Sequence, residues 1–149
     1  MRGTVKHICV VGIGRVGLPL ALVLAKEGFK VTGIDISEER LDLLNKGKVP
    51  FIEEGAEPLL KKFYNNGFVA LHESVLPEIL PKMDAIILTL GTPMNDNFSP
   101  DVTQITNFLD KFSKYLQKGQ LIILRSTVTP TTTEYLARFL KETHGWEVG

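Results

Sequence analysis

Three glycines stand at the spacing of a phosphate-binding turn in the run Gly12, Ile13, Gly14, Arg15, Val16 and Gly17. An apolar run precedes this segment and a helical pattern follows it, so the turn joins a strand to a helix. Gly12 permits a tight turn, Gly14 lets the backbone approach a pyrophosphate, and Gly17 lets the helix pack against the strand. Because free N–H groups and a positive dipole at the helix N-terminus favour an anion, the run predicts a dinucleotide-binding turn.

A carboxylate follows about twenty residues further along, at the place where a nucleotide ribose would lie. Asp35 closes the next predicted strand and can accept hydrogen bonds from both hydroxyls of an adenosine ribose. The same carboxylate would repel a 2′-phosphate, and Ile36 and Ser37 directly after it carry no cation. The sequence therefore favours NAD over NADP. Arg40 lies one turn into the following helix, where it either covers the adenine or its ribose or is an exposed helix arginine.

Two further polar clusters directly follow apolar runs that are typical of buried strands. Gly91, Thr92 and Pro93 follow the first run, and Ser126 and Thr127 follow the second. The carboxyl ends of parallel strands share one edge of a sheet, so we expect these loops to meet the glycine turn around one dinucleotide. Thr92 and Thr127 can offer hydroxyls there. The alternative for each is ordinary turn chemistry, since a threonine beside a proline is common in loops.

The elements that must position these residues alternate along the chain. Apolar runs predict strands at residues 7–11, 30–34, 69–72, 85–90 and 121–125, all buried. Helical spacing predicts helices at residues 16–27, from a Ser37 cap through 44, at 57–65, from an Asp101 cap to about 117, and from about 131. Residues 46–55 form a loop, and Asn66-Gly67 forms a turn. This alternation predicts an α/β fold, a Rossmann-type doubly wound parallel sheet with helices on both faces.

Composition excludes several classes of protein. A chain of 149 residues that is 44% hydrophobic and 23% charged is one ordinary globular domain. Seventeen basic side chains balance seventeen acidic ones, so no nucleic-acid partner is expected. No stretch approaches the roughly eighteen apolar residues of a membrane span, and we expect a cytoplasmic protein with no membrane partner. One cysteine and three scattered histidines predict no metal site.

Other residues of catalytic type receive no role from the sequence. Cys9 lies within the first predicted strand, where a small buried hydrophobe is expected rather than a nucleophile. Glu53, Glu54 and Glu57 could suggest a carboxylate pair for acid–base chemistry, but no histidine or metal pattern joins them. We therefore expect these glutamates to form a solvated loop and helix start.

Taken together, these residues resemble the NAD-binding domain of the UDP-glucose/GDP-mannose dehydrogenase family, the nucleotide-sugar dehydrogenases. The resemblance runs nearly end to end, through GIGRVGLPLA at 12–21, PFIEEGAEPLL at 50–60, GTP at 91–93 and RSTVTPTTTE at 125–134. Asp35 and Arg40 fall at the family's ribose aspartate and its following basic residue. Glu54 and Pro58 depart from the usual proline and glutamate, and Thr131 replaces a usual glycine.

The resemblance implies NAD-dependent, two-step oxidation of the primary alcohol of a UDP-sugar to the carboxylate, through a cysteine thiohemiacetal and a thioester. The family's nucleophile and catalytic lysine belong to later domains. Of the residues present, the resemblance places Thr127 nearest the chemistry, where it would orient the water or substrate oxygen beside the nicotinamide. The run 121–134 is more similar to the UDP-N-acetylmannosamine dehydrogenase branch than to the glucose branch, so a UDP-N-acetylhexosamine is the favoured substrate.

The chain ends at Gly149, just where a sixth strand would start, so we expect residues 1–149 to be the cofactor half of a larger enzyme. Alone, this half would bind NAD without turnover, and the complete enzyme would be a homo-oligomer. A truncated dehydrogenase should expose an apolar sheet edge. The alternatives are the cofactor domain of a β-hydroxyacid dehydrogenase, whose fingerprint usually reads toward methionine where Leu18 stands, and a non-enzymatic NAD-sensing module that dimerises by itself.

Overall fold

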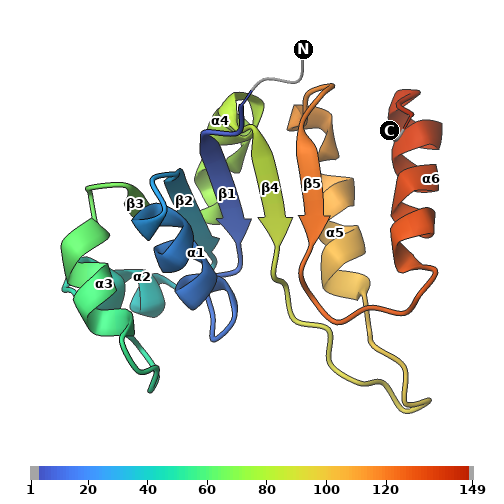
Figure 1. Ribbon diagram of the computed structural model, residues 1–149. Helices are drawn as coiled ribbons and strands as arrows, with labels where there is room; N and C mark the ends of the chain where they lie inside the picture. Colours follow the sequence, from blue (N-terminus) through green and yellow to red (C-terminus); the bar gives the residue numbers. More distant parts are fainter. Residues whose placement is uncertain (1–3, 148–149) are drawn as a thin grey trace.

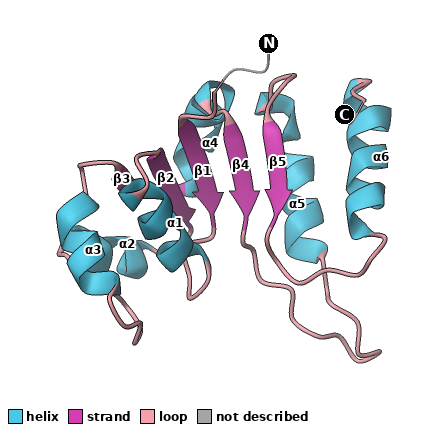
Figure 2. Cartoon of the chain, viewed as in Figure 1, coloured by secondary structure: helices cyan, strands magenta, loops and turns pink. Residues whose placement is uncertain are grey.

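A computed structural model describes residues 4–147 of the chain (Figure 1). Across this range, five parallel strands form one sheet in the order β3-β2-β1-β4-β5. The strands are β1 (His7–Val11), β2 (Lys30–Asp35), β3 (Phe68–His72), β4 (Ala85–Leu88) and β5 (Leu121–Leu124). The chain builds outward from β1 to β3, returns across the centre, and then builds the other way through β4 and β5 (Figure 2). This order confirms the predicted doubly wound sheet.

Helices cover both faces of the sheet because successive strand residues point to opposite sides. In β1, Ile8 and Val10 pack into one apolar cluster with Leu18 and Leu22 of α1, whereas Cys9 and Val11 belong to a second cluster. The second cluster contains residues of α4, α5 and α6. The helices are α1 (Gly17–Lys26), α2 (Glu38–Asn45), α3 (Ala56–Phe63), α4 (Leu76–Ile79), α5 (Thr103–Phe112) and α6 (Thr132–His144).

Some elements end earlier than the sequence pattern predicts. The strand expected at 85–90 stops at Leu88, the last residue of β4 that pairs with β1 and β5, and beyond it the Ser126 hydroxyl donates to the Leu90 carbonyl at 2.6 Å. The helix expected from Asp101 to about 117 covers only α5, followed by a 3₁₀ turn at Ser113–Tyr115. The N-cap of α5 is Val102 rather than the predicted Asp101, whose carboxylate accepts the Thr103 N–H at 2.9 Å from one position earlier.

The segment between β3 and β4 had no predicted structure. It forms two short 3₁₀ turns, η1 (Glu73–Val75) and η2 (Leu80–Lys82), on either side of the four-residue helix α4. Pro77 and Pro81 are the second residues of α4 and η2, in the first helical turn. A proline is tolerated there because its missing N–H would have no partner within the helix, but Pro81 would break one long helix through this segment. Short helical pieces of this kind leave too little periodicity to be recognised from sequence.

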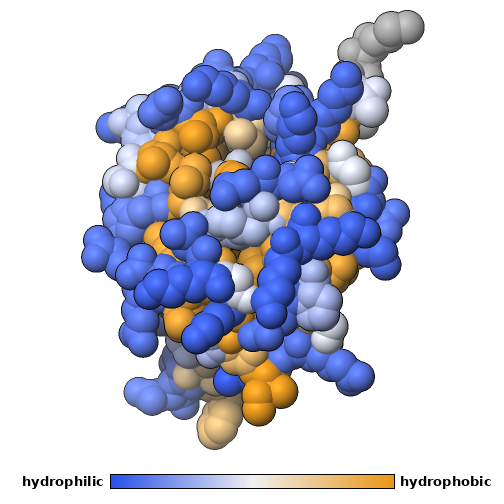
Figure 3. Space-filling view, turned by 90° about the vertical axis from the view of Figure 1, so that its left-hand side faces the viewer, coloured by the Kyte–Doolittle hydropathy of each residue, from blue (hydrophilic) through white to orange (hydrophobic). Residues whose placement is uncertain are grey.

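The outer strand β5 is less buried than predicted. Its four residues are all apolar, yet Leu121 is 50% exposed and the others are half-buried. Within the described residues, β5 pairs with β4 alone and is therefore an edge strand of the sheet. The opposite side of the molecule, which carries α2 and α3, is largely hydrophilic with apolar side chains in separate patches (Figure 3). Between residues 4 and 147, no helix is long and apolar enough to cross a membrane.

Candidate dinucleotide-binding site

The loops that carry the predicted site residues all leave the carboxyl ends of the strands. They follow β1, β2, β4 and β5, and they lie at the end of the sheet toward which the arrows point in Figure 2. The register explains this convergence, since Val11 pairs with Ile34 on one side and with Leu88 on the other. Residues far apart along the chain therefore meet at one edge, as the parallel arrangement requires.

The glycine turn has the conformation that its three glycines predict. Gly12 has a left-handed φ of 90° and donates its N–H to the Ile34 carbonyl at 2.8 Å. A Cβ atom on Gly17 would lie 1.8 Å from the Gly12 carbonyl oxygen, so no other residue fits there. A Cβ atom on Gly14, by contrast, would have no described protein atom within 4 Å. The protein itself requires the first and third glycines, whereas the second keeps space open beside the turn for a ligand.

The N-terminus of α1 faces the same edge and suits an anion. Val16 is its N-cap, but the described structure gives this helix end no side-chain cap and no acidic residue in the first turn. Leu18 donates its N–H to the Gly14 carbonyl at 3.0 Å, which closes the turn onto the helix. Exposed backbone donors and the positive helix dipole remain directed at the space beside Gly14. This arrangement fits a pyrophosphate.

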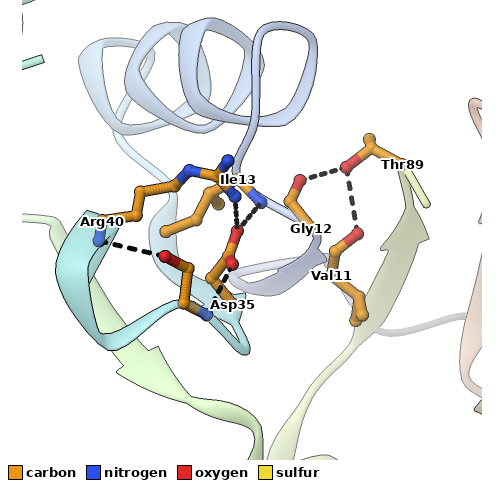
Figure 4. Close-up of polar contacts among 7 residues, drawn as sticks. Val11, Gly12, Ile13, Asp35, Arg40 and Thr89 are labelled. Atoms are coloured by element: carbon orange, nitrogen blue, oxygen red, sulfur yellow. Dashed lines mark hydrogen bonds and ion pairs between the residues drawn. The ribbon is translucent and has the colours of Figure 1, made fainter. Parts of the chain in front are cut away.

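Asp35 lies at the end of β2 and is almost fully buried. One carboxylate oxygen accepts the Ile13 N–H at 3.2 Å and the other accepts the Ser37 N–H at 2.9 Å. The Arg40 guanidinium donates to Asp35 at 2.6 Å (Figure 4). Arg40 is thus not a free helix arginine, because it pairs with Asp35, the residue predicted to bind the ribose. Ile36 and Ser37 carry no cation, as noted from the sequence, but Arg40 brings one to Asp35 from the first turn of α2.

Thr89 is a residue of the site that sequence reasoning missed. Its single O–H is shared between the Val11 carbonyl, at 2.9 Å, and the Gly12 carbonyl. The Thr89 N–H donates to the Val11 carbonyl at 3.0 Å. Figure 4 shows Thr89 on the opposite side of the turn from Asp35. The available signal was that Thr89 is the single polar residue in the apolar run 85–90. A hydroxyl among aliphatic residues at a strand end indicates a specific hydrogen bond.

The loops after β4 and β5 are joined to each other by side-chain hydrogen bonds. The Thr92 hydroxyl donates to the Thr127 carbonyl at 2.7 Å, and the Ser126 hydroxyl reaches back to the loop after β4. The side chain of Thr127 is exposed, whereas Thr92 and Ser126 are half-buried. Gly91 and Pro93 are exposed on the same loop. The Thr92 hydroxyl therefore holds the loops together, and the Thr127 side chain faces solvent.

The expected loop at 46–55 lies next to the glycine turn. The Arg15 guanidinium stands 5.4 Å from the centre of the Phe51 ring, which is a cation–π distance. Residues 49–53, 55, 57 and 58 line an open hollow of about 590 Å³ beside this contact. Arg15 is thereby held near the N-terminus of α1 while its charge stays exposed.

Cys9 lies in the middle of β1 rather than at the site. Its side chain is fully buried, and burial raises the pKa of the thiol from 9.0 to about 12. A protonated, inaccessible thiol cannot act as a nucleophile. In the described part of the chain, no three His, Cys, Asp or Glu side chains gather in a cluster that could hold a metal ion.

Comparison with known proteins gives one consistent result. Residues 6–148 match the model of the UDP-glucose/GDP-mannose dehydrogenase family, NAD binding domain. A UDP-N-acetyl-D-mannosamine dehydrogenase of Campylobacter jejuni is 38% identical over 136 residues, which are 91% of this chain and 32% of that protein. An NDP-N-acetyl-D-galactosaminuronic acid dehydrogenase of Ralstonia nicotianae is 33% identical over 135 residues, 91% of this chain and 31% of that protein.

The similarity extends to three dimensions. The solved structure of a UDP-D-ManNAc dehydrogenase from Pyrococcus horikoshii superposes with a TM-score of 0.86 at 29% sequence identity. The superposition covers 97% of this chain and 34% of the other. The present chain therefore spans about a third of the length of the proteins that it matches.

Proposed function

Because this chain belongs to the UDP-glucose/GDP-mannose dehydrogenase family, whose NAD-binding domain it matches over residues 6–148, we propose that it forms the cofactor site of a nucleotide-sugar dehydrogenase. The family model describes a NAD-binding domain, which confirms the predicted cofactor and the predicted family. The proposal concerns what the complete enzyme does and which residues of this chain take part.

We assign the adenosine half of NAD to the side of β1 that carries β2, and the nicotinamide half to the side that carries β4 and β5. The pyrophosphate would lie against Gly14 and the N-terminus of α1, where backbone donors are free and no side chain intrudes. The adenosine ribose would meet Asp35, which the backbone of the turn already orients. The loops after β4 and β5 would border the nicotinamide half, with Thr127 nearest the reacting atoms. When bound, NAD supplies a hydride acceptor for oxidation of an alcohol.

The overall reaction that we propose is a four-electron oxidation. One primary alcohol, two NAD⁺ and one water give one carboxylate, two NADH and three protons. The relatives named for N-acetylmannosamine and N-acetylgalactosaminuronic acid support a UDP-N-acetylhexosamine rather than UDP-glucose as the substrate. This preference agrees with the segment 121–134, on which the sequence comparison of the two branches rested.

The buried carboxylate of Asp35 beside the open glycine turn is the observation that carries the cofactor assignment. Calorimetric titration of the 149-residue chain with NAD, NADP and UDP-sugars tests it. We expect NAD to bind, Asp35→Ala to weaken that binding at least tenfold, and UDP-sugars to give no heat. The matched control is Asp110→Ala, which removes an exposed carboxylate of α5 and should leave NAD affinity unchanged. Absence of NAD binding by the unaltered chain contradicts the assignment.

The proposed role of Thr127 can be tested only in the complete enzyme, because it concerns turnover. There we expect Thr127→Ala to lower turnover, because the lost hydroxyl no longer orients the oxygen beside the nicotinamide. Thr133→Ala is the control, since it removes an exposed hydroxyl in the first turn of α6. If Thr127→Ala changes neither NAD affinity nor turnover, the proposed role is wrong.

A further inference from the structure

A single peptide group in the glycine turn is held at both of its ends. The carbonyl oxygen of Gly12 accepts a hydrogen bond from the Thr89 hydroxyl, and the N–H of Ile13 donates to the Asp35 carboxylate at 3.2 Å. Gly12 C=O and Ile13 N–H belong to the same planar unit, so its orientation is defined from two directions. Figure 4 shows the two side chains on either side of this peptide.

The two side chains come from the strands that flank β1. Asp35 ends β2, and Thr89 directly follows β4, both of which pair with β1. The Thr89 hydroxyl stands 77 residues from Gly12 along the chain and is half-buried behind the turn. Thr89 therefore connects the cofactor-binding turn to the half of the sheet that carries the loops after β4 and β5.

The Gly12 carbonyl oxygen also lies close to the start of α1. A Cβ atom on Gly17 would approach it to 1.8 Å, and the same Cβ would lie 2.6 Å from the Thr89 hydroxyl oxygen. The start of α1 and the hydroxyl therefore enclose this oxygen from two sides. Loss of the O–H removes the side-chain donor that this carbonyl has in the folded chain.

We propose that Thr89 is a positioning residue of the dinucleotide site. It acts through the Gly12–Ile13 peptide, holding the Ile13 N–H against Asp35 and the following amides toward the pyrophosphate, without contacting the ligand. The inference rests on the proposed function, since it names a residue that prepares the same NAD site. Because Thr89 and Asp35 hold one peptide, their contributions to NAD binding are coupled.

The test compares Thr89→Ala with Thr89→Ser in the 149-residue chain, since the two variants differ in the hydroxyl alone. Calorimetric titration with NAD and with ADP-ribose is the measurement. We expect Thr89→Ala to raise the Kd for both ligands by about five- to twentyfold, as expected for one lost hydrogen bond to an enclosed carbonyl. We expect Thr89→Ser to stay within about twofold of the unaltered chain. Thr106→Val, which removes a hydroxyl donating to the Thr103 carbonyl in α5, is the control and should have no effect.

A double-mutant cycle separates positioning from a general loss of stability. Thr89→Ala should weaken NAD binding less in an Asp35→Asn background than alone, whereas a merely structural role predicts additive losses. Thermal unfolding of each variant, in the absence of ligand, establishes the folded fraction to which the Kd refers. Where Thr89→Ala is unfolded, the cycle is run with Thr89→Cys, which keeps a side chain of similar size but only a weak donor.

The outcomes distinguish this inference from the proposed function. If the unaltered chain does not bind NAD, the proposed function fails and the inference fails with it. If the unaltered chain binds NAD but the folded alanine or cysteine variant binds equally well, the inference alone is wrong. The inference is also wrong if Thr89→Ser loses as much affinity as Thr89→Ala, or if the cycle is additive.

Discussion

The guanidinium of Arg40 lies 2.6 Å from the carboxylate of Asp35, and the two side chains form an ion pair at the end of β2. The start of α2 brings them together, because Ser37 caps the helix by accepting the Arg40 N–H at 3.2 Å. The Asp35 side chain is 5% exposed and that of Arg40 is 35% exposed. The predicted ribose site therefore contains a buried negative charge whose partner reaches solvent.

This ion pair predicts a change of cofactor preference in Arg40→Leu. The substitution leaves Asp35 without a nearby cation, so repulsion of the 2′-phosphate of NADP increases while the neutral 2′-hydroxyl of NAD is little affected. We expect the ratio of the Kd for NADP to the Kd for NAD to rise about five- to tenfold. Calorimetric titration with both dinucleotides measures this ratio, and Arg138→Leu on the exposed face of α6 is the control. A ratio that falls would show that Arg40 does not offset the charge of Asp35.

Replacement of Gly17 and of Gly14 by alanine is predicted to have very different effects on the unfolding free energy. Gly17→Ala places a methyl group 1.8 Å from the Gly12 carbonyl oxygen, and we expect a loss of about 3 kcal/mol or more in unfolding free energy. Gly14→Ala meets no described protein atom within 4 Å, so its unfolding free energy should stay within about 0.5 kcal/mol. Urea denaturation measures both values.

The same two variants separate folding from binding. Gly14→Ala should remain folded yet lose NAD affinity at least tenfold, because its methyl group enters the space that we assign to the pyrophosphate. Normal NAD binding by a folded Gly14→Ala variant would contradict that assignment. Equal stability of Gly17→Ala and the unaltered chain would contradict the packing of α1 on the turn.

Acid stability is predicted to depend on Asp84, at the other end of the sheet. Its carboxylate accepts the Lys6 and His7 N–H groups at 2.9 and 2.8 Å, and these bonds hold the pKa of Asp84 below its ordinary value of 3.8. A pKa lowered by folding contributes stability above the unfolded value, and this contribution is lost as pH falls through the folded pKa. Asp84→Asn should therefore lower the Tm at pH 7.5, with a difference from the unaltered chain that shrinks below about pH 3.8.

Thermal unfolding between pH 2.5 and 7.5 checks this expectation. Asp110→Asn is the matched control, since it removes an exposed carboxylate from α5 without touching the amino end of the sheet. A difference in Tm between Asp84→Asn and the unaltered chain that is constant over the whole range would show that the carboxylate charge plays no part.

Cys9 is predicted to be unreactive in the folded chain. The thiol is fully buried and burial raises its pKa to about 12, so both access and the thiolate fraction are low at pH 8. We expect alkylation by iodoacetamide to be slower than in urea-unfolded chain by about a hundredfold or more. Mass spectrometry of timed samples measures the two rates. Comparable rates would show that β1 opens readily or that the thiol is accessible.

The local features of this protein can be predicted from its sequence alone. The glycine turn, the Ser37 cap and the buried strand at 7–11 all depend on residues close together in the chain, whose spacing reflects backbone geometry. The carboxyl-edge location of Thr92 and Thr127 also followed from the sequence, because parallel strands must share one edge.

The tertiary structure alone decided which partners these residues have. Thr89 donates to the Gly12 carbonyl from 77 residues away in the sequence, and Arg40 of α2 pairs with Asp35 at the end of β2. The half-exposed β5 depends on its place at the edge of the sheet, which its uniformly apolar residues do not reveal. Hydrogen bonds and burial that depend on how separate elements pack form only when the chain folds, so they cannot be predicted from residue spacing alone.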